Sequence, residues 1–86
     1  MGLTPIWKPW TIAARNEPVP GNIRRILKRK GLKQCAVAQK VGMKAHDLTD
    51  MLRGRRIIYA RDIAALASAL DVSVSELFQA PETPEN

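Results

Sequence analysis

The side chains that could do chemistry in this chain of 86 residues lie mostly in one stretch. Amide, imidazole, hydroxyl, carboxylate and cationic groups occur there at Gln34, Lys44, His46, Thr49, Asp50, Arg53, Arg55 and Arg56. No Ser, His and Asp arrangement, no paired carboxylates and no glycine-rich phosphate loop has a useful spacing, so we expect no enzyme. The remaining groups suit hydrogen bonding and charge pairing with a bound partner.

The composition predicts no metal, disulfide or cofactor. His46 and Cys35 are single residues of their types, which excludes a multi-cysteine zinc site and an internal disulfide. We expect His46 to face solvent or a bound partner, and Cys35 to be a small packing residue. No signal peptide and no apolar run of about 20 residues is present, so we expect a cytoplasmic protein with no membrane partner.

Charge is distributed unevenly along the chain. Residues 24–61 hold 12 Lys or Arg against two acids, Asp47 and Asp50, whereas residues 62–86 hold five acids and no Lys or Arg. A solvated surface usually mixes the two signs. A positive block of +10 beside the polar stretch indicates a polyanionic partner, with nucleic acid as the favoured one.

Two short helices must position these side chains. Apolar residues precede Gly42 at Val37, Ala38 and Val41, and others follow it at Leu48, Met51 and Leu52. This pattern predicts helices at about 34–41 and 45–53 joined by a tight turn. The turn needs a residue that accepts a left-handed backbone, and the helix crossing needs a small residue, which Gly42 and Ala38 supply.

These residues carry a resemblance to a known family. The segment from Gly31 to Phe78 resembles the Cro and phage-repressor (lambda-repressor-like) helix-turn-helix domains. The signature consists of Gly31, Leu32, Gln34, Ala38, Gly42, Leu48, Gly54 and the run ALASALDVSVSELF at residues 65–78. The resemblance implies an all-α, five-helix domain and a sequence-specific DNA-binding transcriptional regulator, of the Cro-like repressor, controller or antitoxin kind.

The resemblance also implies roles for individual residues. The helix at about 45–53 would enter the major groove of double-stranded DNA, with residues near its start reaching base edges. Ala45 could touch a thymine methyl group, His46 and Thr49 could donate or accept, and Asp50 could accept from a cytosine amino group. Gln34 would contact phosphate and support this helix. The cationic residues expected to attract phosphates are Arg53, Arg55, Arg56, Lys33 and Lys44.

Two acids oppose this interpretation. Asp47 and Asp50 put negative charge on the helix that should face DNA, although Asp50 could pair with Arg53. The alternative is therefore that the same fold serves as a protein-interaction module or an antitoxin-like partner. The +10 block favours DNA, because a protein adaptor would not need it.

The remaining chain divides into three parts. Residues 1–20 form an arm rich in Pro and Trp, residues 21–80 the helix-turn-helix domain, and residues 81–86 an acidic tail that we expect to be disordered. The tryptophans of the irregular arm could pack on the core, form a dimer contact or follow DNA. A homodimer is expected, because one small module rarely gives enough affinity.

Further expectations concern the frame around the two motif helices. Asn22 should cap a first helix that ends at Gly31, and Leu32 should enter the core. Helices are also expected at about 61–70 and from Val74, where Ser73 and Glu76 form a capping box. Leu27 and Leu52 replace an ion pair that many relatives carry, so we expect them to touch.

Overall fold

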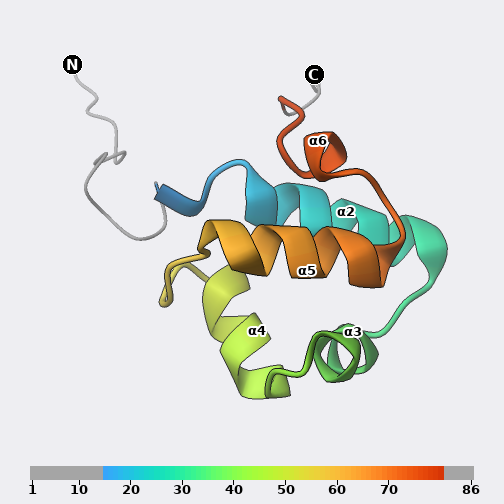
Figure 1. Cartoon of the computed structure of the whole chain (residues 1–86), viewed down its shortest axis with the longest axis vertical. Helices are drawn as coiled ribbons and strands as arrows, with labels where there is room; N and C mark the ends of the chain where they lie inside the picture. Colours follow the sequence, from blue (N-terminus) through green and yellow to red (C-terminus); the bar gives the residue numbers. More distant parts are fainter. Residues whose placement is uncertain (1–14, 81–86) are drawn as a thin grey trace.

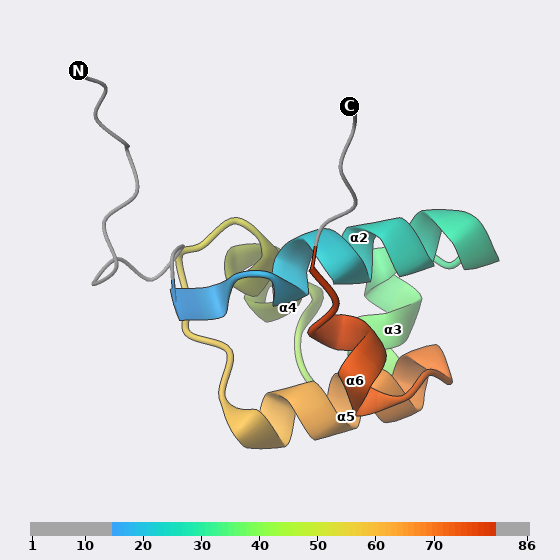
Figure 2. The ribbon, with the colours of Figure 1, turned by 90° about the horizontal axis from the view of Figure 1, so that it is seen from above.

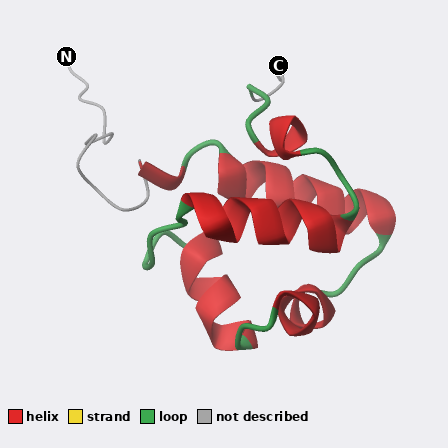
Figure 3. Ribbon diagram, viewed as in Figure 1, coloured by secondary structure: helices red, strands yellow, loops and turns green. Residues whose placement is uncertain are grey.

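The computed structural model describes residues 15–80 and shows five helices and no strand in that range. The helices are α2 (Val19–Lys30), α3 (Gln34–Val41), α4 (Ala45–Leu52), α5 (Ala60–Leu70) and α6 (Val74–Leu77). α3 packs against both α4 and α5, and α2 and α5 lie apart with α6 between them (Figures 1, 2 and 3). The expected all-α, five-helix fold is confirmed. The expectations for the tryptophans and the tail concern residues 1–14 and 81–86, outside the described residues.

The first described helix begins earlier than the sequence predicts. α2 starts at Val19 and includes Pro20, so the start expected near Asn22 is wrong. Proline is tolerated in the first turn of a helix, because the amide that it lacks has no intrahelical partner there. The prolines at 18 and 20 therefore begin this helix instead of preventing it.

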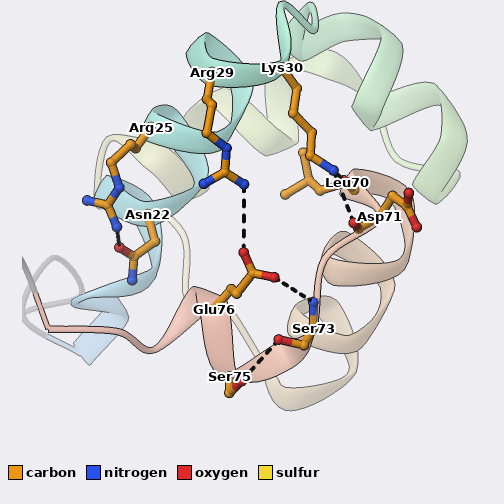
Figure 4. A network of polar contacts seen from close by, with 9 residues as sticks. All are labelled: Asn22, Arg25, Arg29, Lys30, Leu70, Asp71, Ser73, Ser75 and Glu76. Carbon is orange, nitrogen blue, oxygen red and sulfur yellow. Dashed lines mark hydrogen bonds and ion pairs between the residues drawn. The ribbon is translucent and has the colours of Figure 1, made fainter.

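Asn22 connects two helices instead of capping one. Its side chain is 2% exposed, and Nδ2 donates to the main-chain oxygens of Leu77 at 2.7 Å and Gln79 at 3.0 Å. Its oxygen accepts a hydrogen bond from Nη2 of Arg25 (Figure 4). Since a buried amide needs partners, these contacts fix the short α6 against α2.

Aliphatic residues from all five helices form one core. The stripe expected on α2, Ile23, Ile26 and Leu27, is buried as predicted. The cluster also contains Val19, Val37, Ala38, Leu48, Leu52, Leu66, Ala67, Leu70 and Leu77. Leu27 and Leu52 thus share this cluster, and their direct contact stays a prediction. Leu32 is 37% exposed, so its expected place in the core is wrong, because the chain turns outward after the left-handed Gly31.

Part of the positive block faces the acidic half of the chain. Nζ of Lys30 donates to the oxygens of Leu70 at 2.8 Å and Asp71 at 3.0 Å, and Arg29 lies 3.7 Å from Glu76 (Figure 4). A cation at the carboxyl end of α5 satisfies carbonyls that have no intrahelical donor. These two basic residues therefore stabilise the packing of α2 against α5 and α6.

The helix ends follow the sequence in most places. The capping box of α6 is confirmed, with the Ser73 amide donating to Oε1 of Glu76 at 3.3 Å. α3 and α4 begin at Lys33 and Lys44 without a side-chain cap, also as expected. α5 begins one residue earlier than predicted, where the Tyr59 amide donates to Oδ2 of Asp62 at 2.9 Å. Unpaired amides at the starts of α3 and α4 remain available to acceptors.

We predict that Asn22→Ala lowers the free energy of unfolding by about 2 kcal/mol, because two main-chain oxygens lose a buried donor. Asn22→Asp should lower it further, since a carboxylate would face those same carbonyl oxygens. Urea denaturation followed by circular dichroism measures both. Arg29→Ala is the control: its ion pair is largely exposed and should contribute less than about 0.5 kcal/mol. Equal effects at the two positions would contradict the role of Asn22.

Candidate nucleic-acid interface

α3 and α4 are joined by the tight turn that the sequence predicts. Gly42 has φ 86°, and its amide donates to Ala38 at 3.0 Å and Gln39 at 3.1 Å, while the Met43 amide donates to Ala38 at 3.0 Å. A non-glycine residue would be strained at this φ. Ala38 is 0% exposed, which agrees with the small residue expected at the crossing. The turn therefore fixes the angle at which α4 leaves α3.

A direct hydrogen bond also connects the two helices. Nε2 of Gln34, at the start of α3, donates to Oγ1 of Thr49 in the middle of α4 at 2.6 Å. Both side chains are half-buried. The expected support of α4 by Gln34 is therefore present in the structure. Thr49 keeps its own hydroxyl proton for a further acceptor.

The start of α4 is open to solvent. Lys44, Ala45 and His46 are exposed, and the side chain of His46 is 77% exposed. The opposite face is buried through Leu48, Met51 and Leu52. The exposed positions therefore gather at the amino end of the helix. α4 thus presents its first turn outward while its last turn is fixed in the core.

Asp50 has different partners from the one expected. Its carboxylate lies 3.2 Å from Nε2 of His46 and 4.0 Å from Nη1 of Arg55, so the expected pair with Arg53 is wrong. α4 ends at Leu52. The Arg55 amide then donates to the main-chain oxygen of Asp50 at 2.8 Å, which brings Arg55 back toward the helix. Arg53 is exposed beyond this turn.

Asp47 pairs with the next loop arginine. Nη1 of Arg56 lies 3.1 Å from Oδ1 of Asp47, with side-chain exposures of 52% and 26%. Both acids of α4 therefore carry an arginine from the loop that follows it. Such exposed pairs are weak and exchange readily with other anions. The acids hold the arginines near α4, and the arginines offset the negative charge of its surface.

Sequence reasoning missed two residues near this surface. Nη2 of Arg24, on α2, donates to the main-chain oxygen of Leu52, and Arg24 lines an open cavity of about 410 Å³ together with Arg53 and Arg55. Asn16 lies before α2 and hydrogen-bonds the loop after α4. No local pattern marks either residue, because their partners are 28 to 42 positions away.

The described part of the chain shows neither a candidate metal site nor a candidate membrane span. Within residues 15–80, no three His, Cys, Asp or Glu side chains could together hold a metal ion. In the same range no helix has the length and apolarity needed to cross a membrane. Cys35 is exposed, so its expected role as a packing residue is wrong. It lies in the first turn of the uncapped α3.

Comparison with known proteins places this geometry in a family. A family model described as a helix-turn-helix domain matches residues 22–78. The solved structure of the restriction-modification controller protein C.AhdI from Aeromonas hydrophila is 32% identical, covers 70% of this chain and 91% of that one, and has a TM-score of 0.66. Comparison with curated proteins gives no match.

Two further solved structures share the fold at lower identity. The hypothetical transcription factor NHTF from Neisseria is 22% identical over 93% of this chain and 90% of that one, with a TM-score of 0.72. The clp gene regulator ClgR from C. glutamicum is 22% identical over 72% and 80%, with a TM-score of 0.68. The chain belongs to the helix-turn-helix domain family, with α3 and α4 as the two motif helices. The resemblance seen in the sequence is confirmed.

We predict that the hydrogen bond between Gln34 and Thr49 couples the two motif helices. In a double-mutant cycle of Gln34→Ala and Thr49→Val, urea denaturation should give a coupling energy of about 1 kcal/mol. Gln39, exposed on the same helix, supplies the control, and Gln39→Ala with Thr49→Val should show coupling near zero. A zero value for the first pair would show that the bond does not stabilise the arrangement.

Proposed function

We propose that this protein is a sequence-specific DNA-binding transcriptional regulator that inserts α4 in the major groove of double-stranded DNA. The observation that carries the proposal is the exposed first turn of α4, held on a helix-turn-helix frame and flanked by cations. The 32% identity to a structure whose name is a restriction-modification controller protein supports it. A regulator of this kind is not an enzyme and needs no cofactor.

The proposed contacts divide into those that read bases and those that position the protein. Ala45, His46, Thr49 and Asp50 lie along the accessible side of α4, where base edges would be met. Asp50 would accept from a cytosine amino group, and its neighbour His46 would turn toward an acceptor. A major groove admits one helix, which fits the single exposed face of α4.

Positioning contacts would come from both ends of the motif. Gln34 and Lys44 lie at the uncapped starts of α3 and α4, where free amides favour an anion. Arg53, Arg55 and Arg56 follow α4, and the last two exchange their carboxylate partners for phosphate oxygens on binding. Arg24 adds a fourth guanidinium beside the same loop. These contacts orient α4 and carry no base code.

We infer a homodimer on a two-fold-symmetric site. Val74 and Phe78, in and directly after α6, are 44% and 50% exposed, which is high for large apolar side chains on a small domain. In Figure 1, α6 lies above α2 and α5, and α4 lies below them. A second copy bound there would leave both reading helices free. Since such a protein acts by binding DNA, we place this protein in the cytoplasm.

A protein-interaction or antitoxin-like role on the same fold is the second candidate. Asp47 and Asp50 on α4 and the exposed Tyr59, at 55%, favour it, because they offer a mixed surface to a protein. The pairing of both acids with arginines weakens that argument. A protein partner bound through α6 remains compatible with DNA reading by α4.

Selection from random duplex DNA, followed by a salt titration on the recovered site, tests the proposal. We expect a two-fold-symmetric site and an affinity that falls roughly 100-fold between about 50 and about 200 mM salt, as neutralisation of about four phosphates requires. Fluorescence anisotropy of a labelled duplex measures the affinity. No enrichment, or an affinity insensitive to salt, would favour the protein-interaction role.

We further predict that Asp47→Asn strengthens DNA binding. The change removes a negative charge from α4 and frees Arg56, so affinity at low salt should rise roughly three- to tenfold. Asp71→Asn is the matched control, because it changes net charge equally but lies at the far end of α5 from α4 (Figure 1). It should change affinity less than about twofold. A loss of affinity in Asp47→Asn would mean that Asp47 orders Arg56 for binding.

A further inference from the structure

Asn16 is a buried polar residue that precedes α2 and contacts a distant part of the chain. Its side chain is 3% exposed. Nδ2 donates to the main-chain oxygens of Met51 at 3.1 Å and Arg56 at 2.8 Å, and Oδ1 accepts from the Ile58 amide at 2.9 Å. All three partners lie at the end of α4 or in the loop that joins α4 to α5. The side chain therefore bridges the segment before α2 and this loop.

The loop depends on Asn16 over its second half. Its first half continues from α4, because the amides of Arg53, Gly54 and Arg55 donate to oxygens of that helix. Within residues 15–80, by contrast, Asn16 is the hydrogen-bond partner of the main chain of residues 56–58, since the Ile58 amide donates to Oδ1 and the Arg56 oxygen accepts from Nδ2. An irregular main chain without partners samples many conformations. Together with the packing of Ile58 against the core, this amide fixes the path of the loop after Arg55.

An amide side chain fits this position better than a carboxylate or an aliphatic side chain does. Both hydrogens of Nδ2 are donated and the oxygen accepts, so the buried group is satisfied. A carboxylate would keep the bond from Ile58 but turn an oxygen toward two carbonyl oxygens. An aliphatic side chain would leave three main-chain groups without this partner. The chemistry at residue 16 is therefore selective.

The loop that Asn16 fixes is the one that carries the arginines. Arg56 is held at both ends, through its main-chain oxygen by Asn16 and through its guanidinium by Asp47 at 3.1 Å. Arg53 and Arg55 line the cavity of about 410 Å³ with Arg24, and Glu17, the residue after Asn16, lines it too. Residues of two distant segments therefore shape one cationic surface at the end of α4.

We propose that Asn16 is a positioning residue of the DNA interface, which orders the loop so that Arg56 meets a phosphate in a fixed arrangement beside Arg55. This inference rests on the proposed DNA-binding function. A loop that is already ordered loses little conformational freedom on binding, so more of its charge attraction appears as affinity. Asn16 itself is too buried to touch DNA. It acts through the main chain of the loop.

The experiment compares variants of the full chain at a temperature where each is folded by circular dichroism. Asn16→Ala removes the bridge, and Asn16→Ser retains one short donor and acceptor in case the alanine variant does not fold. Ile26→Ala is the stability control, since it shortens a buried core residue of α2. Affinity for the selected duplex is measured across salt concentrations. Hydrogen exchange of the Ile58 amide, relative to that of Leu70 in α5, reports on the loop.

We expect Asn16→Ala to weaken binding at least about tenfold and to reduce the slope of log affinity against log salt by about one, as loss of one ordered phosphate contact requires. Exchange of the Ile58 amide should accelerate relative to Leu70. Asn16→Ser should lie between the wild type and Asn16→Ala. Ile26→Ala should lower stability but retain the wild-type slope.

Two results would overturn the inference. The first is wild-type affinity and slope in a folded Asn16→Ala or Asn16→Ser, which would leave the DNA-binding proposal intact. The second is an equal loss of slope in Ile26→Ala, which would show a general effect of stability. A wild-type chain that binds no duplex removes the proposed function itself, and the hydrogen exchange of Ile58 then shows separately whether Asn16 orders the loop.

Discussion

The structure depends on the anchoring of α4, because this helix cannot be stable alone. It has 8 residues and no side-chain cap, whereas isolated helices shorter than roughly 12 residues are marginal in water. Three buried residues, Leu48, Met51 and Leu52, fix its inner face in the core. The side chain of Gln34 hydrogen-bonds Thr49 in the middle of α4, and the side chain of Asn16 hydrogen-bonds the main-chain oxygen of Met51 near its end. Its geometry is therefore a property of the whole domain, so changes elsewhere can alter how it meets a partner.

The basic residues form two groups that have different partners. Basic residues at the end of α2 pair with α5 and α6, so they contribute to packing. Those after α4 pair with Asp47 and Asp50, in contacts exposed enough to exchange with phosphate. The acids that seemed to oppose DNA binding in the sequence thus have a second role, since they gather arginines at the reading helix. The net charge alone does not distinguish these two groups.

The sequence predicted the features that depend on short-range spacing. Ala38, Gly42 and the five helices follow from local periodicity and backbone preference, and the family match agrees with them. Contacts between distant side chains were not predictable in this way. Asn22 looked like a cap because its type is common there, yet Pro20 starts the helix earlier and turns Asn22 inward. Asn16 gave no signal, since its partners are 35 to 42 residues away.

The family match begins at residue 22, so Asn16 lies outside the matched segment but contacts the loop at its centre. A segment outside a motif can change function without altering the residues that read DNA, provided that it contacts the element that presents them. Here that element is an irregular loop, which has few hydrogen bonds of its own and is bonded in its second half by the amide of Asn16. Variation before α2 is thus a physical route by which a shared helix-turn-helix frame acquires a different cationic surface, while Ala38, Gly42 and the core remain unchanged.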